Sequence, residues 1–289
     1  MMAVAATASL KPTSSCLLCL RPRTKLPAGY RPVLCAIERQ ALFNRIAPVY
    51  DNLNDLLSLG QHRVWKRMAV SWSGAKEGDC VLDLCCGSGD LAFLLSQKVG
   101  SQGKVTGLDF SKEQLFIAAS RQGLLWKPFY KNIVWIEGDA LDLPFPDCHF
   151  DAITVGYGLR NLVDRNKAMK GMLRVLKPGH FILSLSQTHN AHTRISLLLF
   201  FPGARVSILD FNKSSQLFTS TVLEWMIDNV VIPVASSYGL AEEYTYLKSS
   251  IREFLTGREL ETLALEAGFS DAKHYEIGGG LMGNLVAMR

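Results

Sequence analysis

Residues able to do chemistry gather in and just after the stretch Val81–Ala92, which reads VLDLCCGSGDLA. An apolar run ends there in a turn that contains Gly87, Ser88 and Gly89, and a helical pattern follows the turn. Asp109 comes twenty residues after Gly89, at the end of a second apolar run. This spacing predicts a pocket at the carboxyl ends of two parallel strands, where glycines let a ligand approach the backbone and the acid accepts two ribose hydroxyls.

The charges beside the turn bear on which ligand the pocket takes. Gly87 and Gly89, together with Ala92, also satisfy the dinucleotide fingerprint, so the glycines alone leave NAD open. Asp83 and Asp90 flank the turn, which contains no Lys or Arg. Carboxylates at this distance would repel a pyrophosphate and attract a ligand with an ammonium and a sulfonium group. We therefore predict S-adenosylmethionine (SAM) as the ligand; a structural turn with incidental glycines is the alternative.

The first 35 residues have the composition of a targeting segment. They are rich in Ala, Ser and Thr, contain no acid, and hold five basic residues. Those five account for the entire net charge of +5, so residues 36–289 are neutral overall and nothing indicates a nucleic-acid partner. The composition predicts a plastid (chloroplast) transit peptide over residues 1–35, with a disordered N-terminal arm as the alternative. No apolar run is long enough to span a bilayer.

Strand-like and helix-like segments alternate along residues 76–289, which we assign to one main domain. The expected strands are Val81–Leu84, Lys104–Leu108, Lys131–Glu137, Phe150–Val155, Lys273–Ile277 and Asn284–Met288. This alternation predicts an α/β domain with a doubly wound, mostly parallel sheet and an antiparallel C-terminal hairpin. The closing hairpin favours the Rossmann-like fold of SAM-dependent methyltransferases over that of a dehydrogenase.

Helical patterns flank these strands. Residues 36–75 are interpreted as an N-terminal helical lid over the pocket, and residues 214–255 as apolar helices on the substrate side. Ordinary core packing is the alternative for most apolar residues of 214–255. The spacing of Ser111–Gln114 and of Thr256–Glu259 is that of capping boxes, which mark two helix starts.

The cysteines outside the first 35 residues do not have the spacing of a metal site. None of Cys80, Cys85, Cys86 and Cys148 has zinc-ligand spacing, and no Cys-x-x-Cys remains among them. Cys85 and Cys86 lie in the glycine turn, where small side chains are needed. We therefore interpret them as packing residues with free thiols, and we expect no bound metal.

Five further motifs lie outside the glycine turn: Y-D-x-L-N-x-x-L-S-x-x-x-H-x-x-W of Tyr50–Trp65, GLRN of Gly158–Asn161, RVLKPG of Arg174–Gly179, LDFNKS of Leu209–Ser214 and YGLAEEY of Tyr238–Tyr244. With these motifs the chain resembles the ubiquinone/menaquinone biosynthesis C-methyltransferases, from about Ile37 to Arg289 with one interruption. The first motif is long and specific, whereas the glycine turn is generic to SAM enzymes. The last two motifs are similar to the plant plastid branch of the family.

The resemblance implies a SAM-dependent C-methyltransferase acting on a prenylated naphthoquinol. The implied reaction converts demethylphylloquinol to phylloquinol, the last methylation of phylloquinone (vitamin K1) biosynthesis. A benzoquinol methyltransferase of the ubiquinone pathway and an NAD-dependent oxidoreductase remain as alternatives. The phytyl tail of the substrate implies peripheral contact with a membrane, through the lid and the apolar helices. The oligomeric state is left open.

The resemblance also implies which residues surround SAM. They are Ser88, Asp109, Asp139, Ala140 and Gly156. The Asp139 carboxylate would take the adenine amino group, and the Ala140 backbone N–H would meet a ring nitrogen. A cap within the local Asp-Ala turn is the alternative role for Asp139.

Two tasks in C-methylation need side chains: holding the developing phenolate and accepting protons. Arg160 and Asn161 are the candidates for the first task, since a guanidinium there stabilises oxyanion charge; a structural salt bridge is the alternative for Arg160. Tyr50 and Asp51, on the expected lid, are the candidates for proton transfer. His62 is interpreted as orienting the lid rather than as the base.

One segment departs from the family pattern. Lys177-Pro-Gly179 should lead directly into the fifth strand, but residues 180–203 intervene before Ala204–Phe211 supplies the expected sequence. Deleting 180–203 would restore the family pattern across the junction. We interpret 180–203 as an insert, from splicing or a retained intron, without a catalytic role; a genuine loop with a rival strand at Phe181–Leu185 is the alternative.

Overall fold

The computed structural model describes residues 60–187, 193–201, 203–213, 227–237 and 241–289, together with Ser58, Thr221, Trp225 and Gly239. For residues 180–187, 193–201, 231, 235 and 241–245 it describes the backbone alone. The chain divides into two compact units, residues 1–35 and 36–289, and the described residues belong to the second. The expected transit peptide and the expected lid residues Tyr50 and Asp51 lie outside the described residues.

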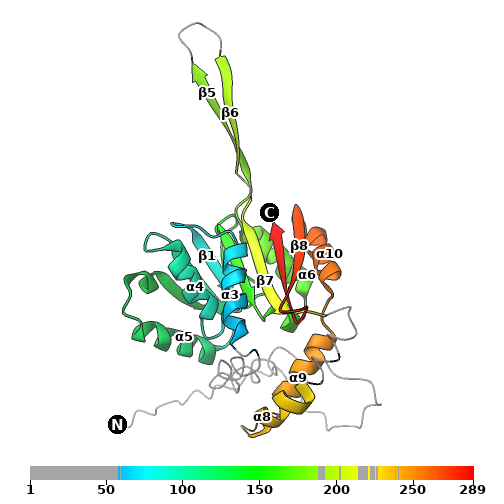
Figure 1. Ribbon diagram of the computed structural model, residues 1–289. Coiled ribbons are helices and arrows are strands. Elements are labelled where there is room, and N and C mark those ends of the chain that lie inside the picture. Colours follow the sequence, from blue (N-terminus) through cyan, green and yellow to red (C-terminus); the bar gives the residue numbers. More distant parts are fainter. Residues whose placement is uncertain are drawn as a thin grey trace, which may run out of the picture. The chain divides into compact units, whose positions relative to one another are not determined.

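Seven strands form a central sheet with the order β3-β2-β1-β4-β7-β9-β8 (Figure 1). The strands are β1 Cys80–Leu84, β2 Lys104–Asp109, β3 Ile133–Glu137, β4 Ala152–Gly156, β7 Arg205–Phe211, β8 Asp271–Ile277 and β9 Met282–Met288. β1 pairs in parallel with β2 and β4, whereas β9 is antiparallel to both β7 and β8. The predicted fold, a mostly parallel doubly wound sheet with an antiparallel C-terminal hairpin, is confirmed.

Helices cover both faces of this sheet (Figure 1). One face carries α3 Gln61–Trp72, α4 Asp90–Val99 and α5 Lys112–Leu124, and the other carries α6 Arg165–Val175 and α10 Gly257–Ala267. Alternate side chains of β1 point to opposite faces of the sheet. Val81 packs in a cluster with Ala69 and Leu95, and Leu82 packs in a separate cluster with Met169. The sheet therefore has a separate apolar core on each side.

Shorter helical segments connect these layers. They are the 3₁₀ turns η1 Pro128–Asn132 and η2 Leu159–Asn161, the π-helical turn η3 Ile227–Val231, α8 Ile232–Ser237 and α9 Ala241–Arg252. None of the helices within the described ranges is both long enough and apolar enough to cross a bilayer. Because η1 takes up Lys131, β3 begins two residues later than the sequence pattern predicted.

Side-chain caps fix the starts of two helices. The Ser111 hydroxyl accepts a hydrogen bond from the Gln114 N–H at 3.2 Å, and α5 ends at Leu124 as predicted. Thr256 and Glu259 form a complete capping box, in which each side chain accepts from the other residue's N–H. Such a cap stabilises a helix by about 1 kcal/mol.

The insert expected at 180–203 forms a two-stranded sheet of its own. β5 (His180–Gln187) and β6 (Thr193–Phe201) pair with each other and, among the described strands, with no other (Figure 1). At the base of this hairpin the Ala204 N–H donates to the Lys177 carbonyl at 3.0 Å. β7, not the rival strand at Phe181–Leu185, pairs with β4 in the central sheet.

Removing residues 180–203 should leave the fold intact, because the chain ends at the base of the hairpin already lie in contact. A Cβ built on Gly203 would come within 3.1 Å of the Gly179 nitrogen. We expect the deletion to change the free energy of unfolding by no more than about 1 kcal/mol, the scale of loop-closure entropy for a change of this size. Urea unfolding of the two forms measures it. Loss of solubility and of methyl transfer in the deletion protein would show that the hairpin is a working part of the enzyme.

Candidate active site

A cavity enclosing about 1180 Å³ of space, its open mouth included, lies at the carboxyl ends of β1, β2 and β4. This is where the strand order reverses, the usual ligand position in a doubly wound sheet. Seven of the eight residues assigned to SAM line the cavity: Asp83, Gly87, Ser88, Asp109, Asp139, Ala140 and Gly156. Residues from four separate stretches of sequence are thus brought to one place.

Gly89, the eighth residue, does not line the cavity but lies against the sheet. Its φ of 90° favours glycine, and a Cβ there would come within 2.6 Å of the Trp135 ring. Close packing of the turn on β3 therefore explains this glycine, and its assignment as a SAM contact stays a prediction. Gly156 does line the cavity, and a Cβ there would come within 2.7 Å of Leu91.

Asp109 ties the end of β2 to the glycine turn. Its Oδ2 accepts from the Gly87 N–H at 2.8 Å, and its Oδ1 accepts from the Ser111 N–H at 2.9 Å. Burial raises the pKa of Asp109, and these backbone donors oppose that rise. The backbone of Phe110 is a third donor that acts in the same direction, and the Asp109 carboxylate still lines the cavity, where a ligand hydroxyl can reach it.

Asp139 forms the local turn that was the alternative to a ligand role. Its Oδ1 accepts from the Leu141 N–H at 2.9 Å, and its carbonyl accepts from the Asp142 N–H at 3.0 Å. Asp139 and Ala140 nevertheless both line the cavity. The turn fixes the Asp139 carboxylate at the cavity wall, so the two roles are compatible.

Asp83 lies at the floor of the cavity and is completely buried. Its Oδ1 accepts from the Thr154 hydroxyl at 2.8 Å. Burial raises the pKa of Asp83 to about 7, against the smaller opposing effects of Thr154 and Lys66. Near neutral pH this carboxyl is therefore charged in only part of the molecules.

Asp90 is neutralised by two cations, which revises the electrostatic argument made from the sequence. Its two oxygens receive Lys66 Nζ and Arg121 Nη2, each at 2.6 Å. Burial alone would raise the pKa of Asp90, but these cations hold it at about 2. The turn is therefore not surrounded by uncompensated carboxylate charge. Lys66, a buried cavity-lining residue of α3, was missed because nothing local in the sequence links it to a turn 24 residues away.

The two thiols of the turn behave as packing groups. Cys85 and Cys86 are both free cysteines, as predicted, and both line the cavity. Burial raises the pKa of each thiol well above its usual value, and Asp109 adds to the rise. Both side chains are therefore neutral at physiological pH. Within the part of the chain that the structure describes, no three His, Cys, Asp or Glu side chains are grouped to hold a metal ion.

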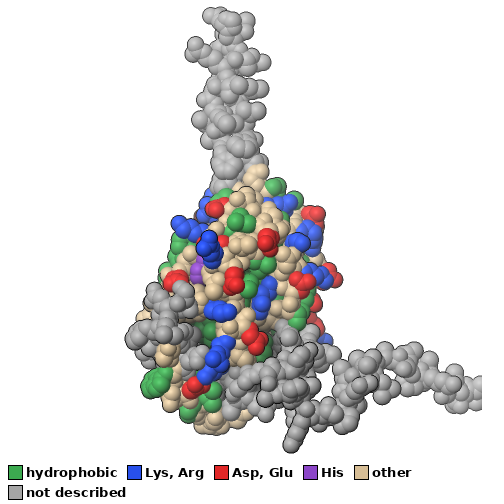
Figure 2. Space-filling model, turned by 90° about the vertical axis from the view of Figure 1, so that its right-hand side faces the viewer, with side chains coloured by type: hydrophobic (Ala, Val, Ile, Leu, Met, Phe, Trp, Pro, Cys, Tyr) green, Lys and Arg blue, Asp and Glu red, His purple; other side chains and the backbone are tan. Residues whose placement is uncertain are grey.

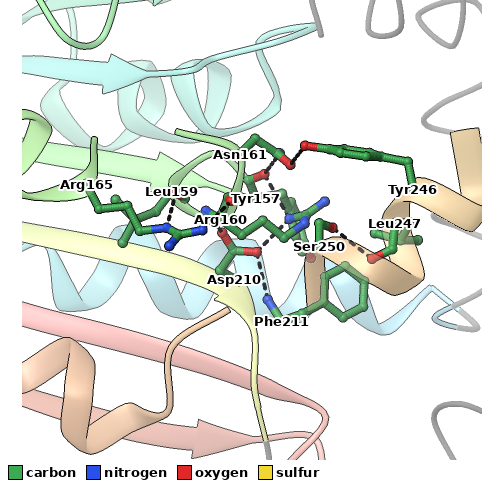
Figure 3. Close-up of polar contacts among 10 residues, drawn as sticks. All are labelled: Tyr157, Leu159, Arg160, Asn161, Arg165, Asp210, Phe211, Tyr246, Leu247 and Ser250. Carbon is green, nitrogen blue, oxygen red and sulfur yellow. Dashed lines mark hydrogen bonds and ion pairs between the residues drawn. The ribbon is translucent and has the colours of Figure 1, made fainter. Parts of the chain in front are cut away.

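Arg160 forms the structural salt bridge that was the alternative to its catalytic role (Figure 3). Its Nη1 donates to Asp210 Oδ1 at 2.6 Å and to the Tyr157 carbonyl at 2.8 Å, and its backbone N–H also donates to Asp210. Both side chains of the pair are only 4% exposed. Arg160 is not among the residues that line the cavity, so it lies behind the wall rather than in it.

Asn161, the neighbour of Arg160, does line the cavity. Its amide nitrogen donates to the Tyr157 carbonyl at 3.1 Å, and its Oδ1 accepts from the Tyr246 hydroxyl of α9 at 3.2 Å (Figure 3). α9 belongs to the segment expected on the substrate side, so this bond joins that segment to the cavity wall. His62 is buried and bonded to Ser58 at 2.9 Å, and it is not among the residues that line the cavity.

Comparison with known proteins agrees with this geometry. The chain matches the ubiE/COQ5 methyltransferase family over residues 36–201 and 194–289, two segments that overlap over residues 194–201 of β6. It is 68% identical over 257 residues to the chloroplastic 2-phytyl-1,4-beta-naphthoquinone methyltransferase of Arabidopsis thaliana, covering 89% of each chain. It is 46% identical to the 2-phytyl-1,4-naphtoquinone methyltransferase of Nostoc sp. PCC 7120, covering 86% of this chain and 96% of that one.

A solved structure shares the fold. A SAM-dependent methyltransferase from Aquifex aeolicus matches with a TM-score of 0.54 and 20% identity, over 82% of this chain and 97% of that one. The sheet order and the closing hairpin give this chain the Rossmann-like fold found in SAM-dependent methyltransferases, with a cavity at the strand ends. It belongs to the ubiE/COQ5 methyltransferase family and is a SAM-dependent methyltransferase, as the resemblance implied.

Replacing Arg160 by Ala should destabilise the enzyme strongly, because it leaves the buried Asp210 carboxylate without its counter-charge. We expect the free energy of unfolding to fall by about 3–5 kcal/mol, measured by chemical denaturation. The matched control is Lys112→Ala, which breaks an exposed ion pair with Glu137 at 3.5 Å and should cost less than about 1 kcal/mol. Equal costs in the two variants would mean that the Arg160–Asp210 pair is not a structural support.

Proposed function

We propose that this enzyme transfers the methyl group of SAM to a ring carbon of a demethylnaphthoquinol with a phytyl tail, the last methylation of phylloquinone synthesis. The observation that carries the proposal is the 68% identity, over 89% of both chains, to a relative named for that naphthoquinone. A cyanobacterial relative at 46% identity has a matching name. The acid-free N-terminal segment and the chloroplastic label of the Arabidopsis relative support a plastid location.

The cavity offers a complementary group for each polar part of SAM. Asp109 accepts from the two ribose hydroxyls, and Asp139 with the Ala140 N–H receives the adenine edge. The ionised form of Asp83 attracts the ammonium. Among the described residues that line the cavity, Lys66 is the only Lys or Arg, and it attracts the carboxylate of SAM. When Lys66 binds the carboxylate of SAM, Arg121 still pairs with Asp90, so Asp90 keeps a counter-charge.

Gln114 supports the same fit. Its Oε1 is buried in the cavity wall and accepts no hydrogen bond from the described residues. A buried acceptor without a donor costs about 1–3 kcal/mol. A hydroxyl from a ligand in this part of the cavity would satisfy it. Sequence analysis identified Gln114 only as a helix cap. It lies in the first turn of α5, three residues after Ser111, and this position explains why it also reaches the cavity.

Methyl transfer requires alignment more than chemical activation. When bound, SAM supplies the methyl group on a sulfonium, which is already a good leaving group. The protein must hold the nucleophilic ring carbon at roughly 3–3.5 Å from that methyl and exclude water. The Asn161 amide, held by Tyr157 and Tyr246, lies at the cavity wall and donates to the quinol oxyanion. Arg160 is a positioning residue, because its ion pair with Asp210 fixes the loop that carries Asn161.

The proton acceptor comes from the expected lid in this proposal. Tyr50 and Asp51 are the candidates for deprotonating the quinol. The phytyl tail makes the substrate a membrane lipid, so the enzyme works in peripheral contact with a bilayer. Leu162 and Val163 add apolar surface to the cavity beside Asn161, where an apolar tail can enter.

A substrate comparison tests the proposal. Purified enzyme with SAM and detergent-solubilised demethylphylloquinol should form phylloquinol with a kcat/KM about ten-fold or more above that for a benzoquinol with the same tail. Thermal shifts with SAM, S-adenosylhomocysteine and NAD provide the control for the donor, and we expect only the first two to stabilise the protein. Preference for the benzoquinol would assign the enzyme to the ubiquinone pathway, and a response to NAD alone would refute methyl transfer.

Asp83 should make SAM binding depend on pH. Its pKa of about 7 means that it is mostly protonated at about pH 6 and mostly ionised at about pH 7.5. The ammonium of SAM binds the ionised form better, so the Kd for SAM should fall about five- to ten-fold as pH rises over this range. An α-amino group of pKa about 7.7–8.0 stays largely protonated there. Calorimetric titration of Asp83→Asn is the control: it should bind more weakly and without this slope, and a slope retained in the variant would assign it to another group.

A further inference from the structure

Large apolar side chains are exposed along α5 and just beyond its end. Phe116 is 75% exposed, and Leu124 and Trp126 are each 84% exposed. Phe116 lies in the first half of α5, about two turns before Leu124. Leu125 and Trp126 continue directly from Leu124. We call Leu124, Leu125 and Trp126 the α5 tip. Such a group of exposed apolar side chains marks an interaction surface.

The loop that follows the α5 tip is packed and hydrogen-bonded to the domain on its inner side. Tyr130 is buried and packs edge-on against Phe93 of α4, with ring centroids 5.6 Å apart. Gln122 Nε2 donates to the Tyr130 carbonyl, and Gln97 Nε2 donates to its hydroxyl, both at 2.6 Å. The loop between α5 and β3 is therefore fixed on its inner side. Trp126 and its neighbours point outward because the space behind them is already filled.

The charged residues that flank the α5 tip along the sequence are of one sign. From Leu115 to Ile136 the sequence contains Arg121, Lys127 and Lys131, and no acid. Arg121 is paired with Asp90, while Lys127 and Lys131 are exposed. The remainder of residues 36–289 must carry a compensating negative excess, since that part of the chain is neutral overall. A positive surface with exposed Trp and Leu is complementary to an anionic lipid surface, where Trp occupies the interface and Lys the headgroup layer.

We propose that the α5 tip is the membrane-docking surface of this enzyme and that it takes an anionic lipid bilayer. Leu124 and Trp126 enter the boundary between headgroups and acyl chains, and Lys127 and Lys131 contact the headgroups. The proposal rests on the proposed function in one respect: a phytyl-tailed substrate resides in such a bilayer. It differs from the expected contact through residues 214–255.

The opposite edge of the sheet provides matched controls. Figure 2 looks onto the β8–α10 side and shows acidic and basic side chains interspersed over it. Leu265 of α10 is 49% exposed there. Lys273 of β8 lies over the Tyr275 ring at 5.4 Å, as Lys127 lies over the Phe129 ring at 5.7 Å. Leu265→Ser with Lys273→Glu therefore makes one apolar replacement and one charge reversal of the same kinds on the β8–α10 side.

Co-sedimentation with vesicles tests the proposal, using phosphatidylcholine vesicles with and without phosphatidylglycerol. The full chain should sediment with the anionic vesicles. Lys127→Glu with Lys131→Glu should lower that binding at least about ten-fold, since each lysine near an anionic surface contributes to it. Leu124→Ser with Trp126→Ser should lower binding to a similar degree and at every salt concentration. The β8–α10 control should bind like the unaltered chain.

Unchanged binding in both tip variants, or equal loss in the β8–α10 control, would overturn the docking surface. A change in the sedimentation coefficient of the tip variants, measured without vesicles, would also overturn it. Such a change would show that the tip of the unaltered protein binds a second copy of the chain. An assay of methyl transfer to substrate in detergent distinguishes failure of the docking surface from failure of the proposed function. The tip variants should keep that activity and lose only activity on substrate embedded in vesicles, whereas failure of the unaltered enzyme in detergent refutes the proposed function alone.

Discussion

Asp90 forms ion pairs that connect three helices at the edge of the cavity, and the position of the glycine turn depends on these ion pairs. Asp90 opens α4 directly after the turn, while Lys66 reaches it from α3 and Arg121 from α5. A carboxylate in the first turn of a helix is also favoured by the helix dipole. Arg121 in addition donates to the Ser88 carbonyl at 2.9 Å, so the turn is held from two sides. The helix that presents the α5 tip is thus bonded directly to the loop that faces the donor.

The parts of this site that could be predicted from sequence are those that local backbone chemistry determines. The Gly87 turn and the acid at Asp109 occur at fixed distances along the chain, because a strand, a turn and a helix have fixed lengths. Helix starts at Ser111 and Thr256 were visible because a cap and its partner are three residues apart. The antiparallel closing hairpin was visible as two apolar runs around glycines, and it identified the fold variant.

The parts that could not be predicted are charge partners distant in the sequence. Asp90 was counted as a bare carboxylate, although its cations come from 24 and 31 residues away. Sequence alone left Arg160 open between catalysis and a salt bridge, and its ion-pair partner Asp210 is 50 residues further on. Asp83 was counted as fully charged, yet burial raises its pKa to about 7. Preference for SAM over NAD therefore rests on the family and on the whole set of cavity groups, not on repulsion by two acids.

The Arg160–Asp210 ion pair explains why the sheet contains β7 rather than the nearer rival strand at Phe181–Leu185. If the chain entered the sheet directly after Gly179, Ser186 would occupy the position of Asp210 and leave the buried Arg160 without a counter-charge, at a cost of about 3–5 kcal/mol. Leu183 would likewise replace Ser207, whose hydroxyl bonds the fully buried Asn284 of β9. Residues 180–187 satisfy their backbone instead by pairing with β6. Polar partners inside the sheet thus set the register where hydrophobicity alone would allow either strand, and the insert leaves the residues around the cavity in place.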